Sequence, residues 1–231
     1  MDPEEVKALA EKYYGVIPAK PEIVPRTRPT EPPQLAERRL HYADPRIGND
    51  YVSRVYLVPE RDPGDQKAAA SLRMLARMLG RASSNSVLAQ KLQFEKQVAV
   101  YTSAWYSGTS LDHGTFGFAV VPAPGVTLEE AEQHLDEAVA EFMEEGVDPD
   151  ALERIKMNLR ANEVYSRDEV SNIANRYGRA LSVGLTVEDV HAWPDLLQAV
   201  TEEDILEAAR TYLDRRASVT GFVRKSEEVT Q

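Results

Sequence analysis

The 231-residue chain contains no cysteine, which excludes disulfide bonds, thiolate catalysis and sulfur-ligated metals. It also lacks any apolar run near the roughly 18 residues that could span a membrane as a helix. The first fifteen residues, MDPEEVKALAEKYYG, show neither the basic segment nor the apolar segment of a secretory signal peptide. With 42% hydrophobic residues, the composition is that of an ordinary globular protein.

Positive charge is scarce. The 27 Lys and Arg residues are outnumbered by 38 Asp and Glu residues, which gives a net charge of −11 and a pI near 5.0. Nucleic-acid binding depends on clustered basic side chains that release counterions from the phosphates. The composition therefore argues against a nucleic-acid partner, and good solubility is the simpler explanation of the acidity.

Histidine is rare as well, and no two of the four histidines are spaced as His-x-x-x-His. A metal site built within one helix is thereby excluded. Residues 134–138, HLDEA, are one side chain short of His-x-x-Glu-His, with which some peptidases bind zinc. On a helical projection Glu137 lies nearly opposite the centre of the apolar stripe. We therefore expect Glu137 to face water, and we interpret the near-motif as accidental.

The loop SLDHG brings together Ser110, Asp112 and His113, three residue types that occur in nucleophilic triads. Triad members normally converge from separate elements, so neighbours within one hairpin loop favour a plain turn. No G-x-S-x-G and no phosphate-binding P-loop motif occurs. Trp105 and Tyr106, at the end of a predicted strand, indicate either a recognition surface or ordinary sheet packing.

Proline divides the chain near its start. Residues 1–15 predict a short amphipathic helix, which we interpret as the tail of a preceding domain. The Pro-rich residues 16–36 predict an extended linker, because proline is incompatible with a helix interior. Residues 37–225 predict one domain, and residues 226–231 a disordered tail.

Within that domain, alternating apolar residues predict strands and 3.6-residue periodicity predicts helices. Thr127, Thr186 and Thr201 each begin a helix as N-caps. The order β-β-α-α-β-β-α-α-α-α-β predicts an α+β fold, with a mainly antiparallel sheet and helices packed on one face. Strands are expected at 36–44, 49–59, 98–106, 115–122 and 217–224, and helices at 66–79, 86–96, 128–146, 149–183 and after Thr186 and Thr201.

A set of phrases in a fixed order resembles one peptidase family. The phrases are AEKYYGVIP before the proline segment, PPQLAERRL, RMLGRASSNSVLAQKL, the hairpin VAVYTSAWYSGTSLDHGTFGFAVVP and EEGVDPDALERIKMNLRA. Together they resemble the second, non-metal domain of the pitrilysin or insulinase family of zinc peptidases. The resemblance covers essentially the whole chain and implies a metalloprotease-type α/β roll.

The resemblance also implies where substrate contacts would lie. In some family members this domain supplies an arginine and, seven residues later, a tyrosine that contact the substrate. The matching positions here hold Gln93 and Val100, and a shift of one residue gives Phe94 and Tyr101. No arginine stands seven residues before any tyrosine in the chain. We therefore expect no catalytic residue, with Gln93, Val100 and Tyr101 as candidate substrate-binding positions.

The function implied by the resemblance is that of an inactive C-terminal domain of a zinc metalloendopeptidase. Such a domain would form half of a peptide-enclosing chamber and a subunit interface. Zinc is expected in the upstream domain and no cofactor in this one. The implied partners are that upstream domain, a homologous second subunit or a homo-oligomer, and an unfolded peptide. A periplasmic location is expected, and a non-catalytic scaffold or core subunit of the same fold is the alternative.

Overall fold

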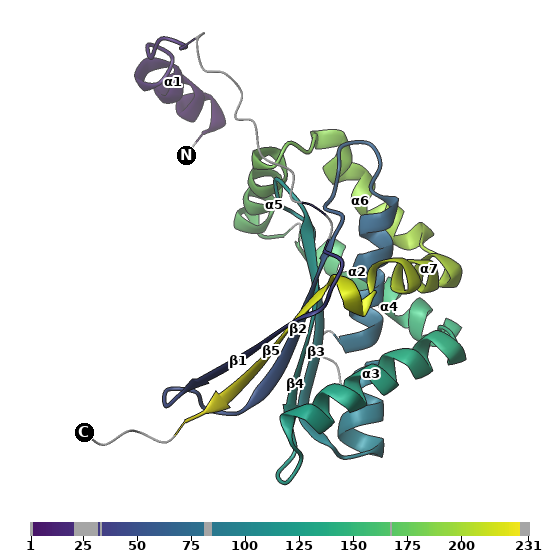
Figure 1. The fold of residues 1–231 in the computed structure, drawn as a ribbon. Coiled ribbons are helices and arrows are strands. Elements are labelled where there is room, and N and C mark those ends of the chain that lie inside the picture. The colour runs from purple at the N-terminus through teal and green to yellow at the C-terminus, as the bar shows by residue number, and fades with distance from the viewer. Residues whose placement is uncertain (1, 21–31, 33, 81–84, 167, 227–231) are drawn as a thin grey trace, which may run out of the picture. The chain divides into compact units, whose positions relative to one another are not determined.

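The computed structural model describes residues 2–20, 32, 34–80, 85–166 and 168–226. The chain divides into two compact units, residues 1–33 and 34–231 (Figure 1). In the first, helix α1 (Pro3–Tyr13) begins at Asp2, whose carboxylate accepts the Glu4 backbone N–H at 3.0 Å. The helix therefore forms as predicted. Most of the predicted linker and tail lies outside the described residues.

The second unit is built on a five-stranded sheet with the order β1-β5-β2-β4-β3. All neighbouring strands are antiparallel except β1 and β5, which are parallel. The predicted mainly antiparallel sheet is thus confirmed. The strands are β1 (Arg38–Asp44), β2 (Tyr51–Val58), β3 (Ala99–Ser107), β4 (Gly114–Pro122) and β5 (Ser218–Lys225).

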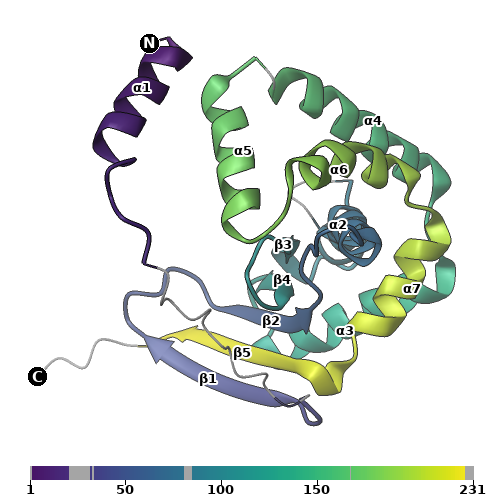
Figure 2. The ribbon, with the colours of Figure 1, turned by 90° about the horizontal axis from the view of Figure 1, so that it is seen from above.

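The helices of this unit lie on one side of the sheet, as Figure 2 shows. The three predicted threonine caps are present, each in a capping box with the acidic residue three positions later. The helical elements are α2 (Lys67–Gly80), the π-helix η1 (Ala89–Glu95), α3 (Leu128–Glu145), α4 (Pro149–Ser166), α5 (Val170–Ser182), α6 (Val187–Ala199), α7 (Glu202–Tyr212) and the 3-10 turn η2 (Arg215–Ala217).

The prediction of one long helix over residues 149–183 is wrong, because α4 ends at Ser166 and α5 begins at Val170. Glu169 has an extended backbone (φ −112°, ψ 110°) that no helix continues through. Tertiary packing supplies most of a helix's stability, and α4 and α5 each bury only one residue fully, Leu152 and Ala180. Little packing therefore opposes the break between them.

The core lies between the sheet and α2, which buries ten of its fourteen residues. Alternate strand residues point toward this layer, and Phe116, Phe118 and Phe222 among them are at most 1% exposed. Gly80 allows the end of α2 to touch β3, since a Cβ atom there would lie 2.4 Å from the Ala104 nitrogen. Close contact at this point positions α2 across the sheet.

Candidate functional surface

The segment that resembles the family's arginine–tyrosine region joins η1 to the start of β3. The Gln93 amide nitrogen donates to Thr102 Oγ1 at 2.7 Å, so Gln93 is engaged with a buried strand residue. A register shift between Ala99 and Tyr101 marks a β-bulge at Val100. Val100 is 57% exposed and Tyr101 49% exposed. The structure thus brings the three candidate residues near one another without forming a polar site from them.

Strand alternation separates the faces on which these side chains lie. Thr102 is buried beneath the helices, so its neighbour Tyr101 lies on the opposite face of the sheet. Gln93 lies on the helix side through its contact with Thr102. Tyr101 is therefore the candidate that reaches the helix-free face of the sheet.

The near-motif HLDEA lies in the middle of α3. Ala138 is fully buried, so the position of the motif's second histidine faces the core. Glu137 accepts hydrogen bonds from Gln133 Nε2 at 2.9 Å and Lys96 Nζ at 3.3 Å, and its carboxylate lies 3.1 Å from His134 Nδ1. These contacts, with Gln133 first, lower the pKa of Glu137 to about 2. Glu137 thus belongs to a surface network.

The Ser110 hydroxyl donates to the backbone carbonyl of Asp112 at 2.8 Å. His113 Nδ1 lies 3.7 Å from a Glu60 carboxylate oxygen. The Ser110 hydroxyl also donates to the backbone oxygen of His113 at 3.3 Å, while the His113 ring lies toward Glu60. Ser110 thus bonds to backbone carbonyls of its own loop, and the arrangement is that of a turn, not a nucleophile with its base. Within the described residues, no three His, Cys, Asp or Glu side chains are grouped so that they could hold a metal ion.

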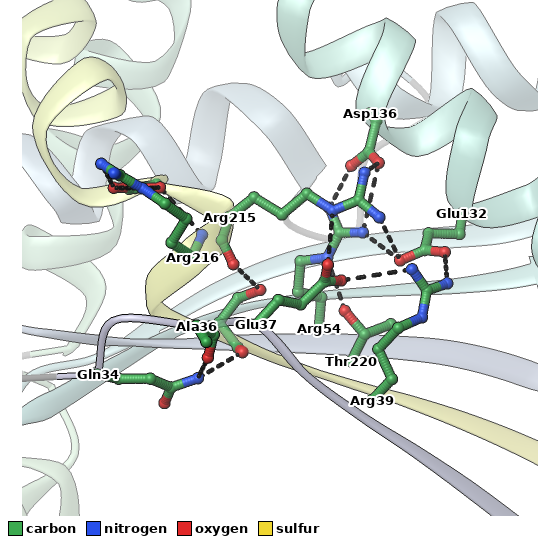
Figure 3. A network of polar contacts seen from close by, with 12 residues as sticks. Gln34, Ala36, Glu37, Arg39, Arg54, Glu132, Asp136, Arg215, Arg216 and Thr220 are labelled. Atoms are coloured by element: carbon green, nitrogen blue, oxygen red, sulfur yellow. Dashed lines mark hydrogen bonds and ion pairs between the residues drawn. The ribbon is translucent and has the colours of Figure 1, made fainter.

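A buried ionic network crosses the helix side of the sheet (Figure 3). Arg54 in β2 is 2% exposed and donates to Glu132 Oε1 at 2.6 Å, to Asp136, and to Thr220 Oγ1 at 3.0 Å. Burial opposes the charge of Arg54, and the contacts with Asp136 outweigh that effect, so its pKa is raised above the usual value. Arg54 thus joins α3 to two neighbouring strands.

Two further arginines complete this network. Arg39 in β1 pairs with Glu132, while Arg215 in η2 contacts Asp136 at 2.8 Å and Glu37 at 3.2 Å. Three guanidinium groups thus meet three carboxylates around the buried pair of Arg54 and Glu132, which gives its charges the partners that burial requires. Our sequence analysis missed this cluster. Its one local signal is Arg54, which stands among the alternate strand positions otherwise filled by Val52, Tyr56 and Val58.

The opposite face of the sheet carries no helix of the described residues 34–226, and its large side chains are accessible. Leu40 is 60%, Tyr42 54% and Leu57 52% exposed on this face. Trp105, also on this face, lies over Gly117, where a Cβ atom would stand 2.2 Å from the indole ring. Tyr106, by contrast, is a core residue, 5% exposed.

Small residues form a row across this open face. Gly221, Ser53, Ala119 and Ser103 are register neighbours on β5, β2, β4 and β3. Larger residues lie two positions away along the strands on either side of the row, except at Gly117 of β4, which Trp105 covers. With about 3.4 Å per residue and an offset of four residues between them, the larger rows are roughly 14 Å apart. The flanking residues are Tyr42, Val223, Tyr51, Val121 and Tyr101 on one side, and Val219, Val55 and Trp105 on the other.

Comparison with known proteins identifies this architecture. The family model described as the peptidase M16 inactive domain matches residues 1–159. The chain therefore belongs to the peptidase M16 family and represents its inactive domain, as the sequence resemblance predicts. A comparison with curated proteins gives no match. In the described part of the chain no helix is long and apolar enough to cross a membrane.

Solved structures share the fold at low sequence identity. A protease from Helicobacter pylori superimposes with a TM-score of 0.86 at 18% identity, over 97% of this chain and 53% of that one. The first half of the periplasmic protease PqqL from Escherichia coli gives 0.75 at 16% identity, over 97% and 49%. The inactive peptidase domain of a zinc protease from Bordetella parapertussis gives 0.68 at 19%, over 79% and 96%. This chain thus spans about half the length of the first two.

Proposed function

We propose that this inactive domain forms half of the chamber of a zinc endopeptidase, whose zinc is held by an upstream domain. The open sheet face carries this proposal. Contiguous exposed apolar side chains on a monomer mark a surface that meets another protein body. Here exposed and partly exposed apolar side chains extend across the five strands, from Leu40 and Tyr42 on β1 to Tyr101 and Trp105 on β3.

The pattern of side-chain sizes on this face suits a chamber wall. A segment of peptide would lie along the row of small residues, between the larger rows. At the edge of the sheet, β3 pairs with β4 only among the described strands, so an extended peptide can add to its outer edge. Tyr101 lies on the open face beside this edge, and we propose it as a substrate contact.

The remaining partners follow from the family. An upstream domain with an intact His-x-x-Glu-His would supply zinc, and a homologous second subunit or a second copy would close the chamber. The exposed apolar residues Val6, Leu9 and Tyr13 of α1 suit packing against the upstream domain. A periplasmic location is proposed by analogy with the PqqL protease, to which the fold is similar.

The test is to produce this chain together with its upstream domain and a homologous second subunit, and to assay cleavage of extended peptides. We expect cleavage that a chelator abolishes. Ala119→Arg, which fills the row of small residues, should lower the rate at least about tenfold, because a charged side chain blocks the chamber wall. Ala174→Arg is the matched control on an exposed position of α5 and should change the rate less than twofold.

Three outcomes contradict the proposal. Chelator-insensitive cleavage by the 231-residue chain alone would place the chemistry within this domain. An equal loss of activity in both arginine variants would remove the open face from the mechanism. An upstream sequence without His-x-x-Glu-His would favour the scaffold alternative.

A further inference from the structure

A second candidate site lies on the helix side of the sheet. Side chains from five separated segments enclose a cavity of about 400 Å³ between α2, α6, the end of α5 and the end of β3. Its position beneath the helices separates it from the open sheet face. Any ligand in this cavity would therefore bind independently of a peptide in the proposed chamber.

The charges around this cavity all have one sign. Arg61, Arg73 and Arg179 line it, and all its lining residues lie in the described part of the chain and include no aspartate or glutamate. In a chain with a net charge of −11, three arginines around one cavity run against the overall composition. Such a cavity attracts anions.

Arg61 is held in place by largely neutral groups. Its guanidinium carbon lies 3.8 Å from the centre of the Trp193 ring, and its Nε donates to Gln66 Oε1 at 2.8 Å. The carboxylate of nearby Asp189 instead accepts backbone N–H groups of Gly64 and Thr186, at 2.9 and 2.8 Å. Stacking on Trp193 therefore fixes the orientation of Arg61 and leaves its charge directed at the cavity.

Arg73 adds a second positive charge beside the first. Its Nη1 lies 3.4 Å from the backbone oxygen of Tyr106, on the strand that leads into the cavity wall. Burial lowers the pKa of Arg61 to about 10; Tyr106 and the charge of Asp189 act against this shift, and the charge of Arg73 adds to it with a smaller effect. Both groups remain charged at neutral pH. An anion between them would relieve their repulsion.

The uncharged lining supplies further hydrogen-bond donors. Thr109, just after the end of β3, brings a hydroxyl group to the lining, and Ser107 and Gly108 line the cavity beside it. A Cβ atom at Gly108 would lie 2.1 Å from the Tyr106 hydroxyl, so glycine is needed for the chain to pass this close. Guanidinium forks together with hydroxyl donors match the tetrahedral oxygens of phosphate.

We propose that this cavity is an anion site that binds a phosphate group, either free or carried by a small organic ester. A phosphate monoester has a second pKa near 6 and carries nearly two negative charges at neutral pH. That charge suits two partly buried guanidinium groups and an exposed third better than a single carboxylate does.

Calorimetric titration of the 231-residue chain at constant ionic strength tests the proposal. Inorganic phosphate and glycerol 3-phosphate are the probes, with sodium acetate as the carboxylate comparison. We expect both phosphates to bind with one site per chain and acetate to bind at least about tenfold more weakly. The tighter of the two phosphates identifies whether the free ion or the ester is preferred.

Matched charge removals localise the binding. Arg179→Gln, at an exposed position, should weaken phosphate at least about tenfold, because a charge-assisted hydrogen bond is lost. Arg210→Gln removes the same charge from α7, outside the cavity, and should change affinity less than twofold. Thr109→Asp adds a carboxylate to the cavity lining and should abolish binding. Melting temperatures confirm that the variants fold.

Several results would overturn this assignment. They are an absence of phosphate binding, equal weakening by Arg179→Gln and Arg210→Gln, retention of affinity in Thr109→Asp, and acetate binding as tight as phosphate. The first and last reject phosphate as the ligand. The other two reject this cavity as its location. None of these results bears on the peptidase proposal, whose test uses the open sheet face.

Discussion

The two faces of the sheet are built from the same strands yet have opposite properties. On the covered face Phe116, Phe118 and Phe222 are buried under α2. On the open face Leu40 and Leu57 are more than half exposed, although their side chains are purely hydrocarbon as well. Hydrophobicity alone therefore does not decide which side of a strand is buried. The difference arises because the helices of residues 34–226 cover one face only.

The covered face therefore serves the stability of the domain, and the open face is available for interaction with a partner. Burial against the helices supplies the hydrophobic free energy of folding, which scales with the apolar area removed from water. The exposed apolar residues of the open face add little to the stability of the isolated domain. Their area stays available for a partner, and substitutions there should alter assembly more than folding.

The largest expected effect concerns the buried charges of the covered face. Arg54→Met should lower the free energy of unfolding by about 3 kcal/mol, because Glu132 remains buried with fewer partners. Arg38→Met is the matched control on the exposed strand β1 and should cost less than about 0.5 kcal/mol. Urea unfolding measures both.

A second substitution tests whether the buried charge is the cause. Arg54→Met combined with Glu132→Gln should lose less stability than the sum of the single variants, since both members of a contacting pair are altered. Additive losses would show that Arg54 contributes packing alone. Equal losses in Arg38→Met and Arg54→Met would remove the proposed difference between the two faces.

A smaller effect is expected from adjacent residues of β4. Val120 is 1% exposed on the covered face, whereas its neighbour Val121 points to the open face and is half-buried. Val120→Ala should lower the free energy of unfolding by about 2 kcal/mol through lost burial and a residual cavity. Val121→Ala should cost less than about 1 kcal/mol. Chemical denaturation of the pair compares the faces within one strand.

If Val121→Ala were as destabilising as Val120→Ala, the claim that the open face is uncovered would be wrong. Such a result would mean that a second element covers this face in solution, such as another copy of the chain. Repeating the measurement over a range of protein concentrations distinguishes these cases, because stability that depends on association rises with concentration.

Local patterns predict most of the fold because the signals for its elements are local. Capping boxes at Thr127, Thr186 and Thr201 begin their helices where the sequence indicates. The ionic network could not be predicted in this way, since Arg54 and Glu132 are 78 residues apart in the chain and meet only through packing. The row of small residues likewise depends on the register of four strands, which no local pattern specifies.

The candidate site was predicted only as far as the family resemblance reaches. The family resemblance gives the positions of Gln93, Val100 and Tyr101. The face of the sheet on which each side chain lies depends on a β-bulge and on the contact between Gln93 and Thr102. The arginine-lined cavity is invisible to sequence analysis for a similar reason. Arg61, Arg73 and Arg179 come from a loop and two helices, and only the folded chain groups them.

The smallest expected effect lies in the near-motif of α3, where adjacent residues face opposite ways. Ala138 is buried, whereas Glu137 is in water and its pKa is lowered to about 2 from an ordinary 4.5, first by Gln133. Its carboxylate contacts thus favour the folded state above pH 4.5 and are lost as the pH falls toward 2. NMR titration of Glu137 should show its midpoint near pH 2, moving toward 4.5 in Gln133→Ala and staying in place in Gln198→Ala. A wild-type midpoint near 4.5 would mean that these contacts are not held in solution, as surface contacts between flexible side chains often are not.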